Sequence, residues 1–167
     1  LQTIGESTVK LSATDQATIN DFMREYVDKS YNVPMNAVRL SSEHTDAHRR
    51  MIFEVCNALL SHNIPFYTEV RLKCGCIPDI VCPTHIVPFI EVLSSETMEM
   101  FEELKLHKYP AEFRELPDKS KSKEVFSEGR IVGEVFSIAY PFCIIKLRQE
   151  FKEKNLKALG SELKLLS

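Results

Sequence analysis

The sequence predicts an α/β or α+β fold in which helices flank a central mixed sheet. Three short candidate strands follow one another between two amphipathic helices, and this order favours a sheet that helices cover. The chain has 167 residues, of which 44% are apolar and 27% are charged, so one globular domain is expected and disorder of the whole chain is not. The net charge of −3 excludes a uniformly basic nucleic-acid coat, although a local basic patch remains possible.

Apolar residues spaced three or four positions apart predict the helices. The first helix follows Ser12 or Thr14, either of which can cap it, and Pro34 closes this unit. A second helix is predicted over residues 41–62, where a proline-containing step ends it. A third, over residues 94–109, completes the pair that encloses the strands.

The three candidate strands lie between the second and third helices. Residues 65–72 alternate between apolar and polar, which predicts a half-buried strand. Cys74-Gly75-Cys76 is predicted to form a turn, because glycine tolerates positive φ. A short strand is predicted to follow over residues 77–82. The nearly continuous apolar run 86–93 is typical of a central strand covered on both faces.

The remainder of the chain gives weaker patterns. Residues 111–117 predict a fourth strand, residues 130–140 fit a strand or a helix, and residues 143–159 have helical spacing. These elements divide the chain into an N-terminal helical extension, a core and a C-terminal helical extension packed on the same domain, over residues 1–40, 41–117 and 118–167.

Two carboxylates stand at the second and third candidate strands. If these strands are neighbours, Asp79 and Glu91 can converge at one edge of the sheet. Carboxylates a few ångströms apart repel each other, and a hard divalent cation such as Mg²⁺ removes that cost. Glu54, beside the buried face of the second helix, is a candidate third carboxylate.

Each of these acids also has a structural interpretation. Asp79 follows Pro78 and could be a turn residue that accepts backbone hydrogen bonds, and Glu54 could be a solvated helix flank. Glu91 stands among apolar residues, where burial without a partner or an ion is costly, so a site role is favoured for it.

The stretch from Glu43 to Pro110 resembles the PD-(D/E)xK nuclease superfamily, most closely its small resolvase-like and virus-encoded members of archaeal type. The resemblance is carried by Glu54 in a helix, Pro78-Asp79 on a strand and Glu91-Val92-Leu93 on the next strand, together with the strand order. It implies a restriction-endonuclease-like fold and a metal-dependent endo- or exodeoxyribonuclease that acts on DNA, commonly as a homodimer.

The resemblance also implies a set of metal ligands and shows one departure from the family. Asp79, Glu91 and the main-chain carbonyl of Val92 are expected to hold Mg²⁺ or Mn²⁺. The family places a lysine two residues after the strand glutamate, and this position is Leu93 here. A leucine can neither stabilise the pentavalent phosphate nor help to deprotonate water.

Another lysine could supply the missing function. Lys73 is nearest to Asp79 in the sequence and is the preferred substitute, with Lys105 and Lys108 as alternatives. If no lysine does so, the protein is a catalytically inactive DNA- or protein-binding module on a nuclease scaffold.

Further candidate ligands lie near the starts of the second and third helices. His44 and His48 are four residues apart and share a helical face, so they could bind a metal, a DNA phosphate or Glu54. They could equally belong to a polar helix N-terminus in solvent. Glu96 is a possible additional ligand, or an acid favoured by the helix dipole.

Basic residues give candidate contacts to a phosphate backbone. The alternative for the C-terminal ones is an ordinary solvated helix face, and the apolar run 142–145 could form a dimer contact. The candidate nucleic-acid-binding residues are Arg49, Arg50, Lys146, Arg148 and Lys152.

The five cysteines and the N-terminal sequence indicate in which cellular compartment the protein is expected. Cys74, Cys76 and Cys82 lack the usual spacing of a zinc site and are expected to be reduced core or turn residues. No signal peptide or membrane span is evident, so a cytoplasmic location is expected, or the host cytoplasm for a viral protein. No membrane partner and no organic cofactor are expected.

Overall fold

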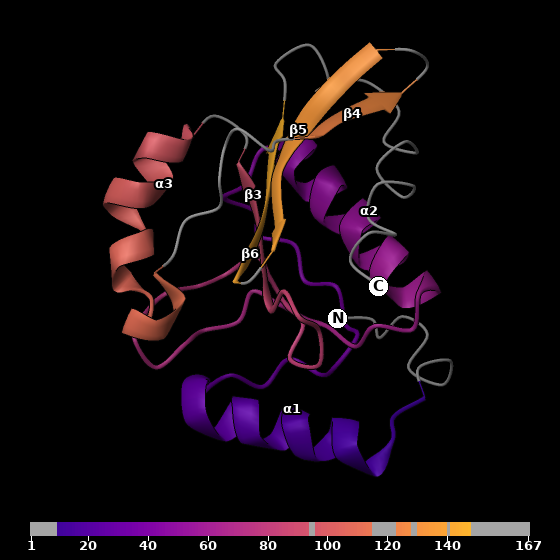
Figure 1. Ribbon diagram of the computed structural model, residues 1–167, viewed down its shortest axis with the longest axis vertical. Helices are drawn as coiled ribbons and strands as arrows, with labels where there is room; N and C mark the ends of the chain where they lie inside the picture. Colours follow the sequence, from indigo (N-terminus) through magenta and orange to yellow (C-terminus); the bar gives the residue numbers. More distant parts are fainter. Residues whose placement is uncertain (1–9, 94–95, 115–122, 128–129, 140, 148–167) are drawn as a thin grey trace.

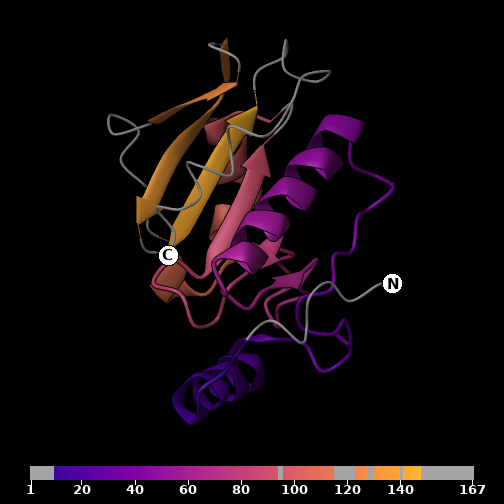
Figure 2. The ribbon, with the colours of Figure 1, turned by 90° about the vertical axis from the view of Figure 1, so that its right-hand side faces the viewer.

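The computed structural model describes residues 10–93, 96–114, 123–127, 130–139 and 141–147. Helices cover both faces of a mixed sheet, with α2 and α3 on opposite sides and α1 across one end (Figure 1, Figure 2). The elements are α1 (Ala13–Tyr26), α2 (Asp46–Ser61), β1 (Tyr67–Thr68), β2 (Ile80–Val81), β3 (Phe89–Leu93), α3 (Met98–Leu104), the 3₁₀ turns η2 (Leu106–Lys108) and η3 (Ala111–Phe113), β4 (Lys123–Ser127), β5 (Arg130–Ala139) and β6 (Phe142–Leu147).

The sheet has six strands in the order β1-β2-β3-β6-β5-β4. Only β3 and β6 run parallel, and every other neighbouring pair is antiparallel. The expected coarse class, a mixed sheet flanked by helices, is therefore confirmed. The three strands between α2 and α3 form one half of the sheet, and β3 lies at its centre, where helices cover both faces.

Two apolar clusters occupy the two faces of the sheet, because side chains alternate along a strand. Ile90 and Val92 of β3 pack with α2, whereas Phe89 and Leu93 pack with α3. The second cluster is rich in aromatic rings: Phe89 lies 4.9 Å from Phe113 and 5.7 Å from Phe142, centroid to centroid. Glu91 is two residues from both Phe89 and Leu93 on the strand, so it shares their face and lies on the α3 side of the sheet.

Hydroxyl caps fix the starts of all three α-helices. The Oγ of Ser12 accepts the N–H of Asp15 at 3.0 Å, which confirms one of the two predicted caps of α1. Thr45 caps α2 in the same way, so the helix begins at Asp46 and the expected start at residue 41 is wrong. This later start keeps His44 outside the helix and places His48 in its first turn.

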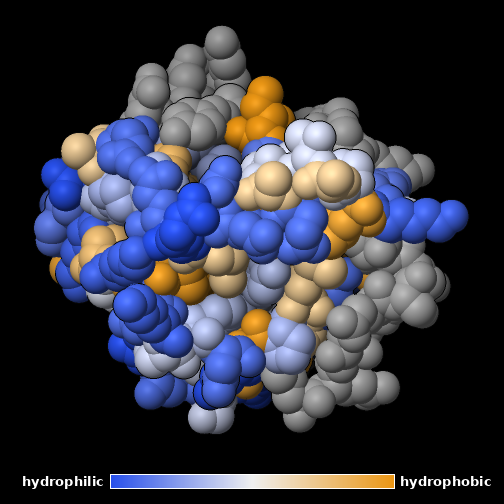
Figure 3. Space-filling model, turned by 90° about the horizontal axis from the view of Figure 1, so that it is seen from below, coloured by the Kyte–Doolittle hydropathy of each residue, from blue (hydrophilic) through white to orange (hydrophobic). Residues whose placement is uncertain are grey.

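Helix α1 contributes one apolar stripe to the α3 side of the core. Ile19 is buried, and the Phe22 ring lies 6.1 Å from that of Phe89. The surface seen from below, the side on which α1 lies, is mainly hydrophilic with small apolar areas (Figure 3). None of the helices in the described residues has the length and apolar character needed to cross a membrane.

The C-terminal half differs most from expectation. Residues 111–113 form a 3₁₀ turn instead of a fourth strand, and 130–139 are strand β5. Phe142–Leu147 is strand β6, so the expected helix over 143–159 is wrong in its first residues, and the rest of it lies outside the described residues. The run 142–145 is buried inside the sheet and is not a free dimer surface.

Candidate active site

Asp79 and Glu91 meet where β2 begins. Because Ile80 pairs with Ile90 in antiparallel register, the preceding Asp79 stands opposite Glu91. The Asp79 N–H donates to Oε1 of Glu91 at 3.3 Å, and the Val92 N–H donates to Oδ2 of Asp79 at 2.8 Å. Both acids are buried, with 6% of Asp79 and 1% of Glu91 exposed.

The buried Glu91 carboxylate has a partner on each oxygen. Lys105 Nζ donates to Oε1 at 2.8 Å, and the Tyr109 hydroxyl donates to Oε2 at 2.8 Å. Lys105 follows the last residue of α3 and keeps 32% of its side chain exposed, so it reaches the acid from the solvent side. Charge-assisted hydrogen bonds of this kind reduce the cost of burying a carboxylate.

Two histidines complete the polar cluster from the α2 side. His48 Nε2 lies 3.4 Å from Oδ2 of Asp79, and the ring of His44 stacks on that of His48 at 3.9 Å and 7°. One ligand atom from each of His44, His48 and Asp79 lies within 4.8 Å of the others. On its other side, His44 Nδ1 lies 3.8 Å from Oε1 of Glu69.

The surroundings drive the pKa values of the two acids apart. Burial disfavours the charged Asp79, but the His48 hydrogen bond and the charge of Lys105 outweigh it and hold the pKa of Asp79 below its ordinary value. Burial raises the pKa of Glu91 to about 7; the charge of Lys105 opposes this rise, and the charge of Asp79 adds to it. Burial, and then the neighbouring His48, lower the pKa of His44, which favours its neutral, ligating form.

A pocket of about 400 Å³ opens above this cluster. It lies between the start of α2, the β2 and β3 strands and α3, and its lining includes Leu93 and Glu96. Met100 and Leu104, which also line it, are 41% and 60% exposed. The charged groups therefore lie in a pocket with an apolar rim, where electrostatic interactions are stronger than in water.

Among the other expected site residues, Val92 and Glu96 line the pocket, but Glu54 and Lys73 do not. Glu54 is half-buried on the flank of α2. Lys73 is exposed, and its Nζ donates to the backbone carbonyl of Arg24. The preferred substitute lysine therefore lies against the end of α1, and it is Lys105 that contacts Glu91.

The expected nucleic-acid contacts are dispersed. Arg49 donates to a backbone carbonyl in the loop before α2, and both Arg49 and Arg50 are half-buried. Lys146 is half-buried on β6, and Arg148 and Lys152 lie outside the described residues. The described members of this set do not line the pocket.

Sequence reasoning missed Tyr109 and ranked Lys105 below Lys73. Lys105 follows α3 and Tyr109 follows the 3₁₀ turn η2, so the two residues do not share a helix face and no helical spacing pointed to them as a pair. Comparison with protein-family models, curated proteins and solved structures found no match to this chain. Function is therefore inferred from the site itself.

Glu91→Gln should remove part of the pH dependence of stability. Glu91 titrates near pH 7 when folded and near 4.5 ordinarily, so the folded state holds a proton that the unfolded chain releases between these values. The contribution of this proton to the free energy of unfolding is full below about pH 4.5. It is lost as the pH rises to about 7, which lowers the free energy of unfolding by roughly 3 kcal/mol in total. Urea unfolding between about pH 5 and about pH 8 without divalent ions measures this.

The matched control is Glu102→Gln on the exposed surface of α3. It should keep the slope of the wild type. Equal slopes for wild type and Glu91→Gln would contradict the assignment of this titration to Glu91.

Proposed function

We propose that this protein is a metal-dependent nuclease on a PD-(D/E)xK-type scaffold that hydrolyses DNA phosphodiesters. One observation carries the proposal: Asp79 just before β2, Glu91 of β3 and Lys105 just after α3 line a single pocket. The order of α2, three strands and α3, with a mixed sheet, agrees with the order on which the resemblance rests. We propose in addition that the sheet and its helices adopt the restriction-endonuclease-like fold.

The donors around Asp79 fit a divalent cation. Asp79 keeps its charge because its pKa lies below the ordinary value, and it groups with His44 and His48 within reach of one ion. The resemblance adds Glu91 and the Val92 carbonyl as expected oxygen ligands, although Glu91 is not part of that group and its two oxygens are bonded to Lys105 and Tyr109. His44 and His48 add imidazole nitrogens, which suit Mn²⁺ better than Mg²⁺. When bound, the cation would lower the pKa of a water and stabilise charge on the phosphate.

The protein groups around the cation site have separable roles. Lys105 brings a positive charge to the pocket and takes the part of the motif lysine, while Leu93 stands in the motif position. Tyr109 holds Glu91 in place through its hydroxyl, so the carboxylate is oriented before any ligand arrives. The apolar rim at Met100 and Leu104 limits access of bulk water to these charges.

A second candidate function is a catalytically inactive DNA- or protein-binding module. The observation that favours it is the closed network at Glu91, in which Lys105 and Tyr109 already satisfy both carboxylate oxygens. Such a network stabilises a buried acid without any cation. Leu93, in place of the motif lysine, favours it too.

Metal titration with a cleavage assay separates the two candidates. We expect calorimetry to detect binding of Mn²⁺ and Mg²⁺, with Mn²⁺ the tighter, because imidazole ligands favour it. Plasmid nicking and digestion of linear DNA should require either ion and stop when EDTA removes it. If neither metal binding nor cleavage occurs, the binding module is the correct function and the nuclease proposal fails.

A further inference from the structure

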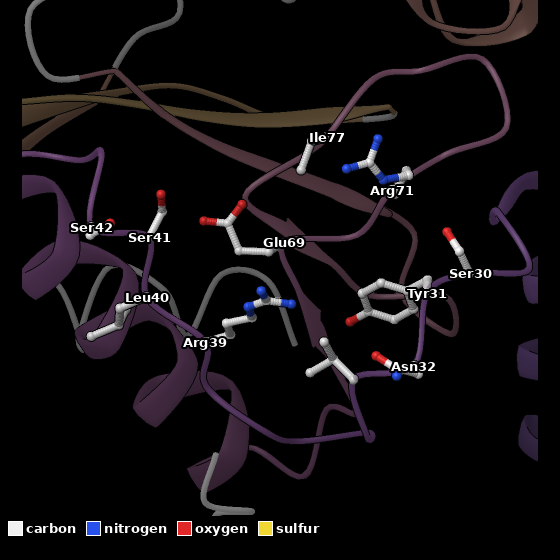
Figure 4. A pocket seen from close by; sticks show the side chains of 11 residues that line it. Ser30, Tyr31, Asn32, Arg39, Leu40, Ser41, Ser42, Glu69, Arg71 and Ile77 are labelled. Carbon is white, nitrogen blue, oxygen red and sulfur yellow. The ribbon is translucent and has the colours of Figure 1, made fainter.

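A second pocket, of about 530 Å³, lies beside the candidate active site. Arg39, Arg71 and Glu69 line it, and Tyr31 and Ser41 complete two of its walls (Figure 4). These side chains come from loops before α2 and after β1, which are far apart in the sequence.

The two arginines are available to a ligand. Both are exposed, and within the described residues neither guanidinium makes a hydrogen bond or an ion pair. Arginine presents its donors as a planar fork that matches phosphate geometry. Two such groups around one concavity therefore form a pocket suited to an anion.

Glu69 is the one acid in the lining, and its carboxylate is directed toward the histidines. Its Oε1 lies 3.8 Å from His44 Nδ1, on the active-site side. Because one carboxylate faces two guanidinium groups, the acid offsets only part of the positive charge of the two arginines.

Hydrogen bonds hold the walls of this pocket in place. The Arg39 N–H donates to Oγ1 of Thr68 at 2.9 Å, and the Tyr31 hydroxyl donates to the Thr68 carbonyl at 2.8 Å. Glu69 has a φ of +50°, which is unusual for a residue other than glycine, and its N–H donates to the Asp79 carbonyl at 3.1 Å. The backbone of this pocket is therefore joined directly to the backbone of the active site.

The two pockets are adjacent along one surface. Ile77 lines both of them, and Glu69 contacts His44 of the other pocket. A nucleic-acid strand carries a phosphate about every 3.4 Å of helix axis. Because the two pockets share Ile77, a strand with one phosphate at Asp79 would carry its neighbouring phosphates along the surface on which the arginines lie.

We infer that the pocket between Arg39 and Arg71 binds a backbone phosphate of the nucleic-acid strand that is cleaved at Asp79. The inference rests on the proposed function and names its substrate contact. It assigns nucleic-acid binding to residues of two loops and leaves Arg49 and Arg50 a structural role at α2.

Binding of a labelled single-stranded oligonucleotide, measured by fluorescence anisotropy in EDTA, tests this directly. Arg39→Gln and Arg71→Gln should each weaken binding several-fold at low salt. Each should also reduce the slope of log affinity against log salt by about 0.7, since one phosphate contact is lost. Arg39→Lys and Arg71→Lys, which keep the charge, should retain most of the slope.

Arg24→Gln is the matched control, because Arg24 is an exposed arginine on α1 that pairs with Asp21 at 2.6 Å. It should bind the oligonucleotide as the wild type does. Inorganic phosphate should compete with the strand weakly, and a polyglutamate peptide should not compete at equal charge. Unchanged affinity and slope in both glutamine variants, or better competition by the peptide than by DNA, would overturn the inference.

The assay contains no divalent ion, so its outcome is independent of cleavage. Loss of binding in the arginine variants, with no nicking by the wild type in Mn²⁺, would support the phosphate site and reject the nuclease. Normal binding by these variants, with metal-dependent nicking by the wild type, would reject the phosphate site and keep the nuclease.

Discussion

Lys105→Ala is expected to lower DNA cleavage by about 10²- to 10³-fold, the usual effect of removing one preorganised charge-stabilising donor. Lys105 Nζ lies 2.8 Å from Glu91 and lines the pocket, so its charge is placed beside the proposed reacting phosphate. Metal binding should persist in the variant, because the substitution removes a cation that competes for Glu91. Initial rates of plasmid nicking, with calorimetric titration of Mn²⁺, measure both effects.

Two further variants test whether Lys105 is the lysine that acts in cleavage. Lys73→Ala should cleave at the wild-type rate, because the Lys73 amine is bonded to the carbonyl of Arg24, away from the pocket. Leu93→Lys in the Lys105→Ala background should recover part of the activity, since residue 93 lines the same pocket and occupies the family's motif position. Wild-type cleavage by Lys105→Ala would contradict the lysine assignment.

The folding of Lys105→Ala needs a control of its own. Removing the lysine leaves the 1%-exposed Glu91 without its cation, and breaking a buried pair in this way is strongly destabilising. The double variant Lys105→Ala with Glu91→Gln removes both charges and should regain stability in urea unfolding. Comparing the two distinguishes loss of the fold from loss of chemistry.

The sequence was sufficient to place Asp79 and Glu91 together, because that arrangement depends on local pattern. Three short strands in succession pair with their neighbours, and the antiparallel register between β2 and β3 puts the two acids opposite each other. The choice among lysines depended on tertiary structure instead. The reach of Lys105 is set by how α3 ends and packs on Phe142, which no local pattern specifies.

The incorrect prediction at residues 143–159 has a similar cause. A short apolar run such as Phe142–Leu147 fits a buried strand and a buried helix equally well, and periodicity alone does not distinguish them. Its parallel pairing with β3 joins segments about fifty residues apart in the chain, so the sheet contact that decides between them is non-local.

The arginine pocket illustrates a third limit. Arg39 and Arg71 stand in loops without charge clustering, whereas the sequence concentrates basic residues in the C-terminal segment and at Arg49 and Arg50. The two loops are brought together at Thr68, whose side chain accepts the Arg39 N–H and whose carbonyl accepts the Tyr31 hydroxyl. A phosphate site built by such a contact is visible only in three dimensions.

Asp79→Asn is expected to reduce cleavage by about 10³-fold or more, since loss of a metal ligand removes several kcal/mol of transition-state stabilisation. The amide preserves the shape and can still accept the Val92 N–H, which lies 2.8 Å from the carboxylate oxygen. It removes the charge that draws a cation to His44, His48 and Glu91. Calorimetry should therefore show weaker binding of Mn²⁺, and nicking should fall in proportion at limiting metal.

Alanine variants of His44 and His48 test whether the cation is held from the α2 side of the pocket. His48 is 3.4 Å from Asp79 and His44 stacks on it, so replacing either with alanine should weaken Mn²⁺ binding more than Mg²⁺ binding, because the variant loses one of the two imidazole ligands. Asp21→Asn, on the exposed face of α1, is the control for a simple change of charge. Undiminished nicking by Asp79→Asn would mean that the acid does not hold the catalytic ion. The carboxylate of Asp79 would then have a structural role through the Val92 N–H and His48, and the proposed cation site would be rejected.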